Sequence, residues 1–221
     1  MPNPAGLLER GLEELGLPSS GPLSQALGRY IARIELRNPA WGLVGASGDE
    51  LVIKHILDSL APAALIAELL RRTEPPRRPA LADLGTGAGL PGVPLALALP
   101  GADVALIDRM TRRIRFLEEL VDELPLPNVR IIETQVEHAR GAYDIVVFRA
   151  FRPFERKLFK RVFALCAPDG AVVAYKGKIE KARAELAAIE GLYAQAEIHP
   201  LKVPFLEDER CAVLLRPAPR T

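Results

Sequence analysis

The stretch Leu81-Ala-Asp-Leu-Gly-Thr-Gly-Ala-Gly-Leu-Pro-Gly-Val-Pro94 decides the fold of this chain. It predicts a buried strand over Ala80–Leu84, a turn with four glycines, and an apolar helix over Val93–Leu99. Because glycine has no Cβ, the backbone can turn tightly and approach a ligand closely, and the first N–H groups of the helix point toward that ligand. Asp108 ends the next predicted strand, and a carboxylate about 20 residues beyond such a turn is the expected partner of ribose hydroxyls. We therefore expect a nucleoside-containing cofactor at this turn.

The glycine spacing alone leaves two kinds of cofactor open. Gly87-x-Gly89-x-x-Gly92 matches the fingerprint of dinucleotide-binding domains. Asp83 favours S-adenosylmethionine, because a carboxylate at this place can accept hydrogen bonds from the loop or, through water, from a cofactor ammonium group. The last apolar runs, 196–203 and 211–215, predict a closing antiparallel hairpin, which is the methyltransferase variant of a doubly wound sheet.

Composition narrows the class of protein further. The chain has 221 residues, of which 49% are hydrophobic and 26% charged, as is typical of a globular protein. The net charge of +1 favours no class of partner, so any basic surface must be local. Cys166 and Cys211 lie in apolar stretches, and no Cys or His spacing predicts a metal site. The sequence has neither a signal-peptide pattern nor an apolar run of about 18 residues, so we expect a cytoplasmic protein without membrane or metal partners.

The chain divides into two predicted parts. Residues 1–75 carry apolar side chains at spacings of three and four, which predicts a helical segment packed on the core. Within it, Ser59 followed by Pro62 predicts the N-cap of a helix over Leu60–Arg72. Residues 76–221 alternate strand and helix patterns, which predicts a Rossmann-like, mostly parallel sheet with ligands at the carboxyl ends of its strands.

The chain resembles the bacterial RsmG (glucose-inhibited division protein B) family in five segments. They are Asp83–Pro94, His55-Ile-Leu-Asp-Ser-Leu60, Arg113-Ile-Arg-Phe-Leu117, Arg149-Ala-Phe151 and Lys176-Gly177. The resemblance implies a class I S-adenosylmethionine-dependent methyltransferase that modifies guanine N7 in 16S ribosomal RNA of the small subunit. It also implies cofactor contacts at Gly85, Leu90, Val136, Glu137 and Arg149, to which the loop and ribose arguments add Gly87 and Asp108.

Two positions depart from the family pattern. Gly42-Leu43-Val44 stands where the family usually has Asn-Leu-Thr, and Phe148 stands where a Ser usually precedes the Arg-Ala-Phe motif. We expect the polar contacts of those family residues to be absent here or to be made elsewhere.

Methylation of guanine N7 needs no general base, because the nitrogen already carries an unprotonated lone pair at neutral pH. We therefore assign no catalytic residue. Positive charge moves from sulfur to the purine, so Arg149 and Lys176 are better suited to the cofactor carboxylate or to RNA phosphates than to the reacting atoms. Arg210 opens the final strand at the same edge. We expect it to contact an RNA phosphate, the alternative being that it only neutralises the acidic run Glu207–Glu209.

Several other side chains have two interpretations. His55 and Asp58 fall one helical turn apart and could face the pocket together, or Asp58 and Ser59 could cap the next helix. Basic clusters at 109–115 and 152–161 could bind RNA or form solvated faces. Tyr175 and Phe151 could stack on a base or pack in the core.

Two rival functions follow from the same residues. A small-molecule S-adenosylmethionine-dependent methyltransferase would use the same cofactor site with a closed apolar pocket. A nicotinamide-dependent reductase is disfavoured, because Tyr175 and Lys176 are adjacent rather than one helical turn apart. We expect a monomer whose partner is 16S ribosomal RNA or the small ribosomal subunit.

Overall fold

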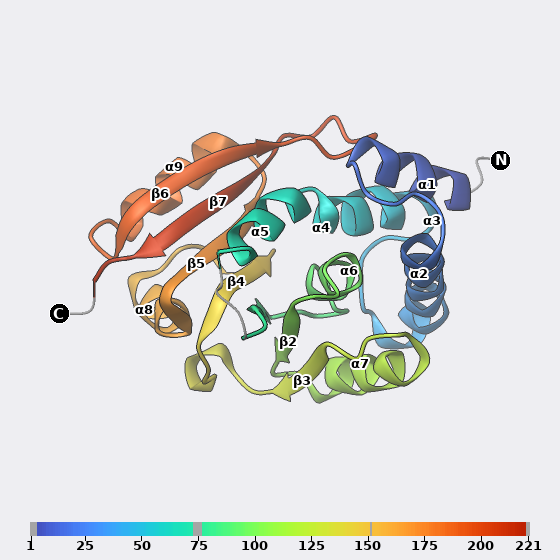
Figure 1. Cartoon of the computed structure of the whole chain (residues 1–221), viewed down its shortest axis with the longest axis horizontal. Coiled ribbons are helices and arrows are strands. Elements are labelled where there is room, and N and C mark those ends of the chain that lie inside the picture. The colour runs from blue at the N-terminus through green and yellow to red at the C-terminus, as the bar shows by residue number, and fades with distance from the viewer. Residues whose placement is uncertain (1–3, 73–76, 151, 220–221) are drawn as a thin grey trace.

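A seven-stranded sheet with helices on both faces organises the computed structural model, which describes residues 4–72, 77–150 and 152–219 (Figure 1). The strands are β1 (Ala80–Leu84), β2 (Asp103–Asp108), β3 (Val129–Glu133), β4 (Tyr143–Arg149), β5 (Cys166–Lys176), β6 (Tyr193–Leu201) and β7 (Arg210–Pro217). Their order across the sheet is β3-β2-β1-β4-β5-β7-β6. The first five strands are parallel, and β7 is antiparallel to both β5 and β6. The predicted doubly wound sheet with an antiparallel end is confirmed.

Successive side chains along each strand point to opposite faces of the sheet, where they pack into two hydrophobic cores. Leu81 contributes to the first core and Ala82 to the second, because successive strand residues point to opposite faces. The first core lies under α6 (Gly92–Ala98), α7 (Thr111–Glu123) and the N-terminal helices, whereas α8 (Arg156–Ala164) and α9 (Ile179–Ala188) cover the second (Figure 1). A short 3-10 turn, Val136–His138, follows β3.

The N-terminal helices share the first core with the sheet. They are α1 (Pro4–Glu14), α2 (Pro22–Trp41), α3 (Gly48–Leu51), a π-helical turn over Val52–Leu57, α4 (Asp58–Leu60) and α5 (Ala63–Leu70). Leu12, Leu27 and Ile56 are fully buried in the same cluster as strand residues. Because this packing is continuous, the helices form one wall of the carboxyl edge of the sheet.

The predicted N-cap at Ser59 is wrong. The chain runs helically from Gly48 to Leu60, and the Ser59 hydroxyl donates to the carbonyl of His55 instead of capping α5. The π-helical turn before it carries Lys54 and His55, and turns of this kind are frequent at functional sites. The sequence pattern predicted a new helix after Ser59. The π-helical turn instead continues the preceding helix through this residue, so no cap is formed.

The two departures from the family pattern have local explanations. After α2, the Asn38 side chain accepts hydrogen bonds from the backbone N–H groups of Leu43 and Val44, at 2.8 and 2.9 Å. Phe148 is buried in the second core, with ring centroids 6.3 Å from Phe154 and 6.1 Å from Phe159. Phe148 thus serves packing rather than polar binding.

Within the described part of the chain, no helix is long and apolar enough to cross a membrane.

The start of α6 is packed against β1 and β2 as closely as a backbone allows. A Cβ at Gly92 would lie 2.3 Å from Leu106 Cδ2 and 2.8 Å from Asp83 Oδ2. We therefore expect Gly92→Ala to lower the free energy of unfolding by about 1–3 kcal/mol, the usual cost of overpacking. Chemical denaturation measures this. Gly101→Ala is the matched control, because nothing lies within 4 Å of a Cβ there, and equal effects of the two changes would contradict the packing argument.

Candidate functional site

Two hollows open at the carboxyl edge of the sheet. The first, the glycine-loop pocket, has a volume of about 510 Å³ and lies beside the ends of β1, β2 and β3. The second, the arginine pocket, has a volume of about 440 Å³ and lies beside the ends of β4 and β5 and the start of β7. Ala150 lines both of them, and its backbone has a φ of 49°, a conformation that residues other than glycine rarely adopt. The two hollows are therefore neighbours joined at the end of β4.

The glycine-loop pocket contains four of the predicted cofactor contacts. Its lining residues include Gly85, Asp108, Val136 and Glu137. Gly87 lies in the loop beside it, and Leu90 is buried in the first core rather than on the pocket wall. Sequence reasoning missed Met110, Thr134 and Gln135, which also line the pocket. Their position directly after β2 and β3 was the signal that would have found them.

Asp108 holds the glycine-rich loop in shape. Its carboxylate is 3% exposed and accepts hydrogen bonds from the backbone N–H groups of Gly87 and Met110, each at 2.9 Å. Arg113 donates to the same group at 3.2 Å. A carboxylate has about four lone-pair positions, so capacity for a further donor remains. Asp108 therefore has a structural role in the loop whether or not it also binds a ligand.

Behind the loop, Asp83 is fully buried and only half satisfied. One carboxylate oxygen accepts from the Thr86 hydroxyl at 2.6 Å and from the Gly92 N–H at 2.8 Å, while the other has no partner among the described residues. Burial raises the pKa of Asp83 to about 7, against the opposing effects of the hydrogen bonds from Thr86 and Gly92 and of the nearby positive charge of Arg149. The Arg149 Nε is likewise buried without a partner in the described chain. One unused acceptor and one unused donor thus flank the ends of the adjacent strands β1 and β4.

Tyr30 connects the N-terminal helices to the glycine-rich loop. Its side chain is fully buried, and its hydroxyl donates to the carbonyl of Ala88 at 2.8 Å. Burial raises the pKa of this hydroxyl, so it remains a donor at neutral pH. A Cβ at Gly89 would lie 3.2 Å from the Tyr30 hydroxyl oxygen and 2.5 Å from Val93. No sequence motif indicates this contact, because Tyr30 and Ala88 are far apart along the chain.

At the outer rim of the glycine-loop pocket, Glu137 pairs with Arg152. The side-chain hydrogen bond from Arg152 lowers the pKa of Glu137. The pair lies between the 3-10 turn and the loop that follows β4. Glu137 is therefore ionised and held at the pocket rim.

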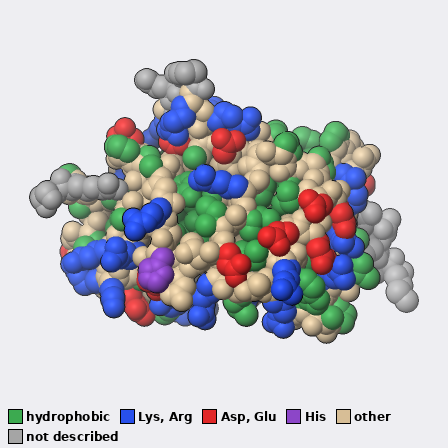
Figure 2. Space-filling model, turned by 90° about the horizontal axis from the view of Figure 1, so that it is seen from below, with side chains coloured by type: hydrophobic (Ala, Val, Ile, Leu, Met, Phe, Trp, Pro, Cys, Tyr) green, Lys and Arg blue, Asp and Glu red, His purple; other side chains and the backbone are tan. Residues whose placement is uncertain are grey.

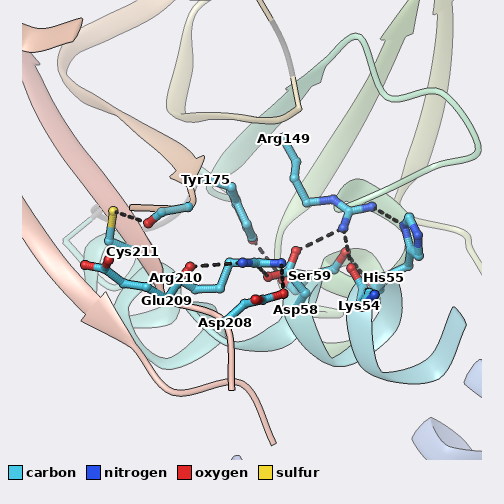
Figure 3. Close-up of polar contacts among 11 residues, drawn as sticks. Lys54, His55, Asp58, Ser59, Arg149, Tyr175, Asp208, Glu209, Arg210 and Cys211 are labelled. Atoms are coloured by element: carbon cyan, nitrogen blue, oxygen red, sulfur yellow. Dashed lines mark hydrogen bonds and ion pairs between the residues drawn. The ribbon is translucent and has the colours of Figure 1, made fainter. Parts of the chain in front are cut away.

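In the arginine pocket, one buried carboxylate stands between two guanidinium groups (Figure 3). Asp58 is 5% exposed; one of its oxygens accepts from Arg149 at 2.9 Å and the other lies 3.2 Å from Arg210 Nε. Arg149 also donates to the Lys54 carbonyl at 2.8 Å. Figure 3 shows the two arginines approaching Asp58 from opposite sides, one from β4 and the other from β7. This bridge excludes the interpretation of Asp58 as a helix cap. It also shows that Arg210 pairs with Asp58 as well as with the acidic run Glu207–Glu209.

His55 completes the surroundings of Arg149. Its Nδ1 lies 2.9 Å from an Arg149 nitrogen. Burial, together with the positive charge of Arg149, lowers the pKa of His55 to about 4, so the ring is neutral at pH 7. Since a guanidinium can only donate, Nδ1 is the acceptor and the ring proton is on Nε2.

Lys176 and Tyr175 lie in the same pocket with partners of their own. Lys176 is 2.5 Å from Glu185 and sits over the Phe154 ring, 4.2 Å from its centroid. Tyr175 is buried and donates to the Ser59 carbonyl at 2.8 Å, which agrees with packing in the core rather than base stacking. Phe151, the other aromatic considered for stacking, lies outside the described residues.

Within the described ranges, no group of three or more His, Cys, Asp or Glu side chains is placed to hold a metal ion. Cys166 and Cys211 are buried, and neither forms a disulfide within the described residues.

The sheet order, its antiparallel end and the glycine-rich turn after β1 are those of the class I S-adenosylmethionine-dependent methyltransferases. The fold is similar to that of a putative S-adenosylmethionine-dependent methyltransferase from Methanococcus maripaludis, with a TM-score of 0.57 and 13% identity over 86% of this chain and 93% of that one. It is also similar to tRNA (m1A58) methyltransferase from Aquifex aeolicus, with a TM-score of 0.56 and 14% identity over 73% and 70% of the two chains.

Sequence comparison gives the family within that class. The family model for rRNA small subunit methyltransferase G matches residues 23–213. Two relatives with the name ribosomal RNA small subunit methyltransferase G are each 36% identical to this chain. The protein of Treponema denticola matches over 95% of this chain and 93% of its own length, and that of Ralstonia nicotianae over 96% and 94%. The chain belongs to the rRNA small subunit methyltransferase G (GidB) family.

Removing the charge of Asp58 should destabilise the protein. Asp58→Asn leaves two arginines, with side chains only 14% and 24% exposed, without their shared anion. We expect the free energy of unfolding to fall by about 2 kcal/mol, below the usual cost of breaking a buried pair because Arg149 keeps two other acceptors. Asp208→Asn is the control: that carboxylate is exposed and 3.9 Å from Arg210, so its loss should be nearly neutral. Equal urea midpoints for both variants and the parent would refute the bridge.

Tyr30→Phe should loosen the glycine-rich loop without opening a cavity. It removes one buried donor and leaves the Ala88 carbonyl unpaired, which should cost about 1 kcal/mol. Amide hydrogen exchange should become faster over residues 85–90, where the anchor is lost. Tyr193→Phe serves as control, because that hydroxyl has no hydrogen bond within the described chain. Unchanged exchange over the loop in Tyr30→Phe would show that the contact does not hold it.

Proposed function

We propose that this protein transfers a methyl group from S-adenosylmethionine to ribosomal RNA of the small subunit, and that guanine N7 is the acceptor. Family membership supports the reaction class and the RNA. The observation that carries the proposal is the pair of unused buried polar atoms beside the glycine-rich loop, Asp83 Oδ1 and Arg149 Nε. A ligand with both an ammonium and a carboxylate group would satisfy both of them.

The residues present fit this cofactor. Its amino-acid tail carries one positive and one negative group, which match the free acceptor of Asp83 and the free donor of Arg149. The nucleoside end suits the glycine-loop pocket, where Asp108 has capacity to accept from ribose hydroxyls and Val136 offers an apolar wall. Glu137 stands at the rim, where an adenine amino group could donate to it. When bound, the cofactor supplies an electrophilic methyl group.

The chain's own contribution to the reaction is then orientation. An N7 lone pair needs no general base, and holding two reactants in line is worth up to about 7–11 kcal/mol of barrier. His55, neutral at pH 7, serves to fix the orientation of Arg149 rather than to move a proton. We propose that RNA enters over the arginine pocket, where Lys176 and Arg210 lie beside Arg149 and phosphate groups would find cations. We further propose that the enzyme acts as a monomer.

The direct test is methyl transfer to small-subunit ribosomal RNA. Purified protein with labelled S-adenosylmethionine should modify RNA or subunit particles from a strain that lacks this gene, and digestion should release 7-methylguanosine. RNA from the parent strain is the control and should accept little label, because its site is already methylated. Label on small molecules with none on either RNA would contradict the proposal and favour a small-molecule methyltransferase.

Cofactor affinity should depend on pH through Asp83. With a pKa of about 7, this side chain is largely protonated below neutrality, and a neutral carboxyl group cannot balance an ammonium ion. We expect affinity for S-adenosylmethionine to rise between about pH 5.5 and 7, by up to about tenfold per pH unit. Calorimetric titration across this range measures it. Asp83→Asn should bind weakly with little pH dependence, whereas Asp103→Asn, which changes an exposed carboxylate, should behave as the parent. A flat profile in the parent would exclude this role for Asp83.

A further inference from the structure

The exposed side of α8 carries positive charge that no acidic residue within the helix balances. One side of the helix is buried in the second core, through Leu158, Phe159, Val162 and Phe163. The remaining side chains of the helix face outward. Those include Lys157, Lys160 and Arg161, all exposed, and the helix contains no acidic residue. Within the described part of the chain, these three side chains form no hydrogen bond or ion pair.

On α7, in contrast to α8, acidic side chains of the same helix balance the positive charge. Its sequence also begins with arginines, but Glu118, Glu119, Asp122 and Glu123 follow in the same helix. Arg33 and Arg37 of α2 pair with Glu119, and Arg113 pairs with Asp108. The view from below in Figure 2 shows this difference: Lys and Arg side chains gather on the left, where α8 lies, while acidic and basic ones mix on the right, where α7 lies. Since the whole chain has a net charge of only +1, the α8 side is a local concentration of charge.

A groove joins this surface to the cofactor region. It has a volume of about 640 Å³ and runs between α8 and the segment after β3, with Arg161 on one wall and His138 and Arg140 on the other. Val136 and Glu137 line both this groove and the glycine-loop pocket. A chain of phosphates lying in the groove would therefore end beside the place where the cofactor is expected.

We propose that the groove and the exposed α8 cations Lys157, Lys160 and Arg161 form a second RNA-binding surface, separate from the arginine pocket, that holds the phosphate backbone of the ribosomal RNA substrate. The inference rests on the proposed function. Charge complementarity supports RNA as the occupant, because two lysines and an arginine on a helix without acidic residues fit closely spaced phosphates and carry no base-reading geometry. The surface would thus add affinity without choosing the target base.

The test removes three charges from this surface and three from elsewhere. The test variant is Lys157→Gln/Lys160→Gln/Arg161→Gln, and the control is Arg29→Gln/Arg71→Gln/Arg183→Gln, which changes exposed cations on α2, after α5 and on α9. Filter binding with a 16S ribosomal RNA transcript at several salt concentrations gives the Kd and its salt dependence. We expect the test variant to bind about tenfold more weakly and to lose about two units of the salt slope, while the control stays close to the parent.

Further readouts separate this proposal from its rivals. Cofactor affinity and melting temperature should match the parent in both variants, because none of the changed residues lines the glycine-loop pocket. In methylation assays the test variant should show a raised KM for RNA with an unchanged kcat. Equal Kd and salt slope in test and control variants would overturn the proposal. So would a test variant that binds naked RNA normally and fails only on subunit particles, because the surface would then contact ribosomal protein. If the parent itself neither binds nor methylates ribosomal RNA, the proposed function fails, and the surface cannot hold this substrate.

Discussion

The carboxylate of Asp58 joins three segments that are far apart in the chain. It lies in the N-terminal helices, and its two oxygens meet arginines from the end of β4 and the start of β7. Without this anion, two partly buried cations would repel each other across the carboxyl edge of the sheet. The arrangement also orders their surroundings, since Arg149 in turn contacts His55 and the Lys54 carbonyl. The carboxyl edge thus depends on this one shared anion. Because Asp58 neutralises only one of the two arginines, the group of three side chains keeps a net positive charge beside the cofactor region.

Local sequence signals predicted most of the sheet and the glycine-rich turn. A buried strand, closely spaced glycines and an acid at the end of the next strand are all properties of neighbouring residues, so β1, the loop and Asp108 were found with nearly correct bounds. The closing hairpin was also found, although β6 both begins and ends earlier than the predicted run 196–203, and β7 extends beyond 211–215 at both ends. The strand bounds differ because polar residues at strand ends can join a ladder without adding to an apolar pattern.

Contacts between distant residues could not be predicted in the same way. The sequence showed that Arg149, Lys176 and Arg210 are cations near one edge, but it did not show that Asp58 pairs with two of them and Glu185 with the third. Tyr30 is 58 positions from Ala88, and an isolated tyrosine in an amphipathic helix is indistinguishable from an ordinary core residue. The predicted cap at Ser59 was wrong for a related reason. The π-helical turn before it buries Val52, Ile56 and Leu57, and this packing against other elements cannot be predicted from neighbouring residues.

The place of β7 in the sheet has a consequence for the order in which the protein is completed. Although β7 follows β5 and β6 in the sequence, it is an interior strand, bonded on one side to β5 and on the other to β6. Until it is inserted, β5 has one unpaired side, and Arg210 is not yet available to Asp58. The carboxyl edge of the sheet is therefore complete only after β7 has paired with β5 and brought Arg210 to Asp58. Since β6 pairs with β7 at the edge of the sheet, insertion of β7 also brings β6 into the sheet, so the closing hairpin and the Arg210 side of the site form together.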